Sequence, residues 1–138
     1  MAVVVLWGLW ALRDPAWLAG AEGGIVAMGP AGQAPSYRRL APHAWFFVPA
    51  SAAAVTIPLT AVFTPEESQP IRVRVSANDR LVAEHEFTSA GAAVLVAPLQ
   101  QVPKAGRRHV RIEILVSRAW TDGLTGLQIG DIGTLPGP

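Results

Sequence analysis

From residue 44 onward, the chain is a series of short apolar runs of alternating polarity, separated by turn residues. A period of two is typical of strands with one buried face, and several such strands without long helices between them favour an antiparallel sandwich. We therefore expect an all-β fold, a jelly-roll or immunoglobulin-like β-sandwich of about seven strands. The expected strands are 44–48, 53–63, 71–77, 81–87, 93–97, 110–117 and 127–132.

One proline interrupts an expected strand. Pro58 lies in the middle of 53–63, whereas Pro49, Pro65 and Pro70 lie between runs. Because proline has no N–H to donate to a neighbouring strand, we expect 53–63 to be an edge strand or two short strands.

The stretch IRVRVSANDRLVAEHEF predicts a hairpin whose register can be derived. A two-residue loop would place valine opposite glutamate, whereas the three-residue loop Asn78-Asp79-Arg80 matches both faces of the hairpin. We therefore expect the three-residue loop. The predicted pairs are Ile71 with Phe87, Arg72 with Glu86, Val73 with His85, Arg74 with Glu84, and Val75 with Ala83.

No stretch of the sequence specifies a reaction. Glu84-His85-Glu86 has the residue types of a metal or acid–base site, but adjacent strand residues point to opposite faces and cannot share a ligand cage. Phosphate-loop, zinc-protease and nucleophile-elbow motifs are absent. We expect no catalytic residue, no metal ligand and no cofactor.

Composition indicates contact with lipid or with another protein. Charged residues make up only 15% of the chain and hydrophobic residues 51%, whereas a typical soluble domain is about 25% charged. The net charge of +1 gives no support for nucleic-acid binding. The absence of cysteine excludes disulfides and thiolate chemistry.

The first residues, MAVVVLWGLWALRDPAW, form an apolar segment that ends at Arg13. A helix over residues 2–12 would cover about 17 Å of a roughly 30 Å hydrocarbon core, and no basic region precedes it as in a signal peptide. We expect a retained arm or short helix that docks on a membrane or in a partner's groove, or that forms part of the domain's own core. The chain then divides into an arm and linker, 1–36, and a sandwich, 37–138. The docking residues are Leu6, Trp7, Trp10 and Trp17.

Two further sets of side chains are candidate contacts. Four cations in the stretch KAGRRHVR could face an anionic surface or could simply be solvated in a loop between strands. An aromatic residue exposed on a sandwich could stack on a sugar, and two aromatic residues of this chain are candidates for such a position. The cations are Lys104, Arg107, Arg108 and Arg111, and the aromatic residues are Tyr37 and Trp120.

The segments YRRLAPHAWFFVP, IRVRVSANDRLVAEHEF and VRIEILVSRAWTDGLTGLQIGDI resemble a known module. They are similar to the C-terminal extracytoplasmic β-sandwich of bacterial multi-pass membrane proteins of the glycosyltransferase-like kind. The resemblance covers about residues 37–133, although the closing LQIGDI lacks the usual Leu-Gly pair. It implies a non-catalytic domain on the periplasmic face of a membrane.

These observations lead to two expected functions. In the first, the chain is an extrinsic structural subunit that packs against lipid headgroups or integral membrane subunits, as in a bacterial energy-converting or transport assembly. In the second, it is a carbohydrate-binding module accessory to cell-envelope glycan synthesis. Exposure of both Tyr37 and Trp120 beside polar groups would favour the second.

Overall fold

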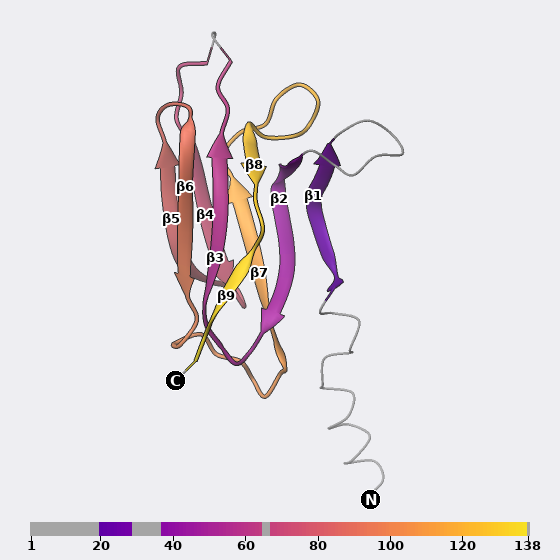
Figure 1. Ribbon diagram of the computed structural model, residues 1–138, viewed down its shortest axis with the longest axis vertical. Helices are drawn as coiled ribbons and strands as arrows, with labels where there is room; N and C mark the ends of the chain where they lie inside the picture. The colour runs from indigo at the N-terminus through magenta and orange to yellow at the C-terminus, as the bar shows by residue number, and fades with distance from the viewer. Residues whose placement is uncertain (1–19, 29–36, 65–66, 138) are drawn as a thin grey trace, which may run out of the picture.

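The computed structural model describes residues 20–28, 37–64 and 67–137, and all of its regular elements are strands. Their order along the chain is shown in Figure 1. The strands are β1 Glu22–Met28, β2 Tyr37–Pro49, β3 Ala52–Ala61, β4 Ile71–Ala77, β5 Arg80–Phe87, β6 Gly91–Pro98, β7 His109–Val116, β8 Leu127–Ile129 and β9 Gly133–Pro136.

The strands form one curled antiparallel sheet in the order β5-β4-β7-β2-β8-β3-β6, with β1 on β2 and β9 on β3. The curl brings β6, at one end of this order, beside β5 at the other (Figure 1). The expected all-β sandwich is therefore confirmed. Apolar side chains of both layers fill the interior, since the alternate residues Ile71, Val73 and Val75 of β4 are at most 1% exposed. Burying one such side chain contributes about 1.5–3 kcal/mol.

Strand β2 joins the two layers. Its first residues pair with β8, whereas His43–Pro49 pair with β7. Pro42 lies between these two pairings, where its missing N–H interrupts neither ladder.

The β4–β5 hairpin confirms the predicted register and corrects the predicted loop. All five expected pairs are present. The loop, however, has two residues, Asn78 and Asp79, both with positive φ, and not three. A bulge after the Val75–Ala83 pair leaves Val82 unpaired. This extra residue restores the facing pattern that a regular two-residue hairpin would have lost.

Strand β3 is neither an edge strand nor divided, so the expectation based on Pro58 is wrong. It pairs with β6 on one side and with β8 and β9 on the other. The Pro58 carbonyl accepts the Gly130 N–H at 2.8 Å, so the nitrogen of the same residue faces that side too. On that side of β3, residues 130–132 connect β8 to β9 and do not pair as a strand. The run 127–132, which was expected to form one strand, therefore ends at Ile129. The missing donor therefore faces a gap.

Strand β1 extends the sheet towards the N-terminus, into the stretch that the sequence reading assigned to an arm and linker. It pairs with β2 along most of its length, with a bulge between Gly23 and Ile25. Gly24 has a φ of 72°, and a Cβ there would overlap the His43 carbonyl oxygen. The four docking residues expected near the N-terminus, Leu6, Trp7, Trp10 and Trp17, lie outside the described residues. No helix that could cross a bilayer occurs in the described part of the chain.

Candidate functional site

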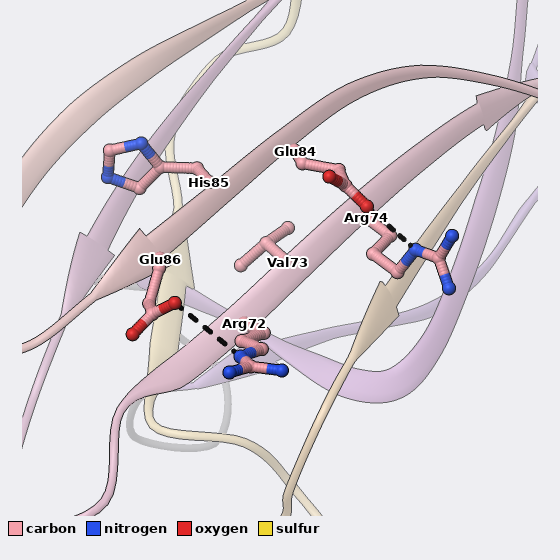
Figure 2. Close-up of a pocket in the computed structure, with 6 residues that line it drawn as sticks. All are labelled: Arg72, Val73, Arg74, Glu84, His85 and Glu86. Carbon is pink, nitrogen blue, oxygen red and sulfur yellow. Dashed lines mark ion pairs between the residues drawn. The ribbon is translucent and has the colours of Figure 1, made fainter.

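The Glu84-His85-Glu86 segment of β5 forms a charge ladder and a separate stacked histidine. Glu84 and Glu86 lie 3.1 and 3.5 Å from the arginines opposite them on β4. The His85 ring points away from both carboxylates (Figure 2) and stacks edge-on against Phe87, with ring centroids 4.5 Å apart. Among the described residues, no group of three acidic, histidine or cysteine side chains could hold a metal ion.

Trp120 lies in a polar network formed around the β7–β8 connection, at the upper end of the sandwich in Figure 1. The Arg39 guanidinium lies 4.6 Å from the ring centroid, and the indole Nε1 donates to Glu67 Oε1 at 2.6 Å. Glu67 in turn forms an ion pair with Arg118 at 2.7 Å. Trp120 is thus half-buried, with one ring face covered and its only polar atom engaged. This indole holds the β7–β8 connection against β2 and the β3–β4 connection.

The same network sets the charge of its two carboxylates. Burial raises the pKa of Glu67, but hydrogen bonds from Arg118, Thr64 and Trp120 outweigh it and leave the pKa below its ordinary value. A hydrogen bond from Arg39 at 2.8 Å lowers the pKa of Asp122. Both carboxylates are therefore ionised at neutral pH, and each forms an ion pair with a neighbouring arginine.

Tyr37 has a different setting from Trp120. Its side chain is 40% exposed and borders a groove between the start of β2 and the end of β8. Polar side chains line the groove, and Arg38 is fixed there because its Nη2 donates to the Gly130 carbonyl at 3.1 Å. The polar lining residues are Arg38, Thr60, Gln128 and Asp131. Of the two aromatic residues proposed for glycan stacking, Tyr37 is thus the more accessible one.

A groove lies where β6 and β7 are connected, at the lower end of the sandwich in Figure 1. It is bordered by the cations Lys104, Arg107 and Arg111, and Arg108 is exposed in the same loop. Sequence reasoning missed Phe47 of β2 and Asn78 of the β4–β5 turn, which line the groove from elsewhere in the chain. Their positions depend on strand order, and the sequence carries no local signal for it.

The outer side of β3 and β6 carries no charge. The four strands of this layer, β3, β6, β8 and β9, contain no charged residue at all. Val94 and Val96 are 62% and 51% exposed, and their cross-strand partners are Pro58 and Thr56. We call this surface the β3–β6 face; it consists of Thr56, Pro58, Thr60, Ala92, Val94 and Val96.

Comparison with known proteins relates this chain to others by its fold alone. No family model matches the sequence, and neither does any curated protein. A family 35 carbohydrate-binding module from Clostridium thermocellum is similar in structure, with 13% identity over 81% of this chain and 88% of that chain, and a TM-score of 0.47. The CBM36-1 domain of a multidomain xylanase from the hindgut metagenome of Trinervitermes trinervoides gives 13% identity over 82% and 91%, and a TM-score of 0.43. A family 35 carbohydrate-binding module from an environmental isolate gives 16% identity over 86% and 91%, also with a TM-score of 0.43.

Proposed function

We propose that this chain is a non-catalytic module that attaches to the periplasmic face of a membrane and packs against an integral membrane protein. The single observation that carries the proposal is the uneven distribution of charge. The layer that contains β4, β5 and β7 presents arginine–glutamate pairs, whereas the β3–β6 face presents valine, proline and threonine. An extended uncharged face is typical of a surface that another protein covers.

The apolar N-terminal segment supplies the attachment to the membrane in this proposal. Trp7, Trp10 and Trp17 are residues that prefer the membrane interface. We expect the full chain to float with neutral phosphatidylcholine vesicles and the variant Trp7→Asp/Trp10→Asp to remain in the soluble fraction. A wild-type chain that floats neither with these vesicles nor with anionic ones would remove the membrane part of the proposal.

Packing of the β3–β6 face can be tested by site-specific photocrosslinking in the cells that produce the chain. A photoreactive residue at Val94 should give a discrete adduct with an integral membrane protein, and the same residue at Arg72 should not. The change Val96→Asp should abolish the Val94 adduct. Equal adducts from both positions, or adducts between copies of this chain alone, would contradict the proposed contact.

Binding of a carbohydrate is the second candidate function, and the setting of Tyr37 is the observation that favours it. An exposed tyrosine beside an anchored arginine and several other polar side chains combines a stacking surface with hydrogen-bonding groups. Calorimetric titration with neutral oligosaccharides should detect binding by the wild type and none by Tyr37→Ala. Absence of binding by the wild type, or equal binding by both proteins, would exclude Tyr37 as a sugar platform.

A further inference from the structure

The lower end of the sandwich, in Figure 1, brings together segments that are distant in sequence. β1 begins there, β2 ends there and β7 begins there, because neighbouring strands are antiparallel. Phe47 borders the groove that contains Gly20–Glu22 and also the groove that contains the cations. The described chain therefore begins at the end of the fold that carries Lys104 and Arg107, and the apolar run of residues 2–12 lies shortly before that point in the sequence.

The β6–β7 connection is held in one conformation by backbone and side-chain hydrogen bonds. The Asn78 side chain donates to the Pro103 carbonyl at 2.8 Å and accepts the Arg111 N–H at 3.0 Å. The Arg107 N–H donates to the Lys104 carbonyl at 2.9 Å, which closes a tight turn. The Arg108 carbonyl accepts the Ala50 N–H at 2.8 Å. The cations thus project from a fixed loop that is tied to two neighbouring turns.

This end of the sandwich carries carboxylates as well as cations, but its cations are concentrated in the β6–β7 connection. Glu22, Asp79 and Glu113 also lie there, but Glu113 contacts His43 at 2.8 Å and Arg111 at 3.4 Å. The connection 99–108 itself contains three cations and no carboxylate. Its sequence is LQQVPKAGRR, so no aromatic residue in it would suggest stacking on nucleobases.

We call the end of the sandwich that carries Lys104, Arg107 and Arg108 the basic end. We propose that the basic end faces anionic lipid headgroups, with the β6–β7 connection in contact with the phosphate layer of the membrane. This inference rests on the proposed membrane attachment and adds an orientation and a lipid class. An apolar segment alone gives weak, reversible binding, and a nearby basic patch supplies the second contribution that stable attachment needs. In this orientation the β3–β6 face points sideways, towards the extramembranous part of a neighbouring membrane protein.

The test measures flotation of the full chain with phosphatidylcholine vesicles and with vesicles that contain about one quarter phosphatidylglycerol. We expect tighter binding to the anionic vesicles, and we expect that gain to disappear between about 0.1 M and about 1 M salt, where the screening length falls from about 10 to about 3 Å. The variant Lys104→Gln/Arg108→Gln should bind anionic vesicles roughly 30-fold less tightly, which corresponds to about 2 kcal/mol.

The control variant is Arg72→Gln/Arg74→Gln. It removes the same number of positive charges from the outer side of β4, towards the start of that strand, whereas the Asn78 turn that contacts the basic loop follows its end. We expect it to bind anionic vesicles within roughly threefold of the wild type. Equal weakening by both pairs would show a response to net charge alone and would overturn the orientation. So would identical binding of the wild type to neutral and anionic vesicles, which would nevertheless leave membrane attachment intact. A wild type that floats with neither kind of vesicle would instead remove the attachment itself.

Discussion

Replacement of Trp120 by phenylalanine removes one hydrogen-bond donor and keeps an aromatic ring in place. The indole Nε1 lies 2.6 Å from Glu67 Oε1, and the Glu67 side chain is only 11% exposed. A hydrogen bond to a charged group contributes about 1.5–3 kcal/mol. Glu67 would keep the Thr64 hydroxyl at 3.1 Å and Arg118 at 2.7 Å, so we expect the lower half of that range. The smaller ring also weakens the contact with Arg39, by about 0.5 kcal/mol.

The expected loss in the free energy of unfolding is thus about 2 kcal/mol at neutral pH. Its pH dependence follows from Glu67, whose pKa in the folded protein lies below its ordinary value of 4.5. A carboxyl group with a lowered pKa stabilises the fold above its ordinary pKa, and this contribution is lost as the pH falls through the folded-state value. The penalty of Trp120→Phe should therefore shrink below about pH 4.5.

Urea unfolding followed by circular dichroism measures both effects, at about pH 7 and about pH 3.5. The matched control is a double-mutant cycle with Glu67→Gln at neutral pH, which should give a coupling energy of at least about 1 kcal/mol. Additive single variants would refute the proposed hydrogen bond, as would a penalty that is the same at both pH values. Either result would also reopen the assignment of Trp120 as an exposed platform.

Three further predictions concern the strands that position the surfaces, and urea unfolding checks the first two. Pro58→Ala should change the free energy of unfolding by less than about 1 kcal/mol, because no backbone N–H is needed at that position. The control Ile57→Ala, at the fully buried neighbouring position, should cost about 2–5 kcal/mol. Similar costs for the two variants would contradict the gap between β8 and β9. Asp79→Gly should stabilise the protein by about 0.5–1 kcal/mol, because Asp79 has a φ of 68° in a two-residue turn, and destabilisation would argue for a different loop. Gly24→Ala should release β1 from β2, since its Cβ would overlap the His43 carbonyl, and hydrogen exchange in β1 should rise while that in β4 stays unchanged; unchanged protection of β1 would refute the close approach.

The hairpin shows which part of the fold the sequence predicts well. Its register followed from matching the two faces, because Arg72 and Arg74 need glutamates opposite them while Ile71 and Val75 need apolar partners. The loop length could not be predicted in the same way, since a bulge at Val82 has no distinct sequence signature. Strand β1 was missed for a related reason: its EGGIVAM sequence has weak strand character, and its pairing with β2 stabilises it.

The surroundings of Trp120 show why the site could be predicted only in part. The residue itself was singled out, but Arg39 and Glu67 are 81 and 53 positions away in sequence. No local pattern signals that such residues will meet. The same holds for Phe47 and the basic loop, whose residues were named individually and whose common position depends on strand order.

The antiparallel topology places the two proposed contact surfaces on different sides of one sandwich. The β3–β6 face runs along the length of the strands, whereas the basic end lies where β1 and β7 begin and β2 ends. A domain that rests on a membrane at one end of its strands necessarily turns its sheet faces sideways. In the proposed orientation, the uncharged sheet face is directed towards a lateral neighbour and the charged face towards solvent. The charge distribution between the two layers therefore fits the same orientation that the basic end indicates, although the two observations involve different residues.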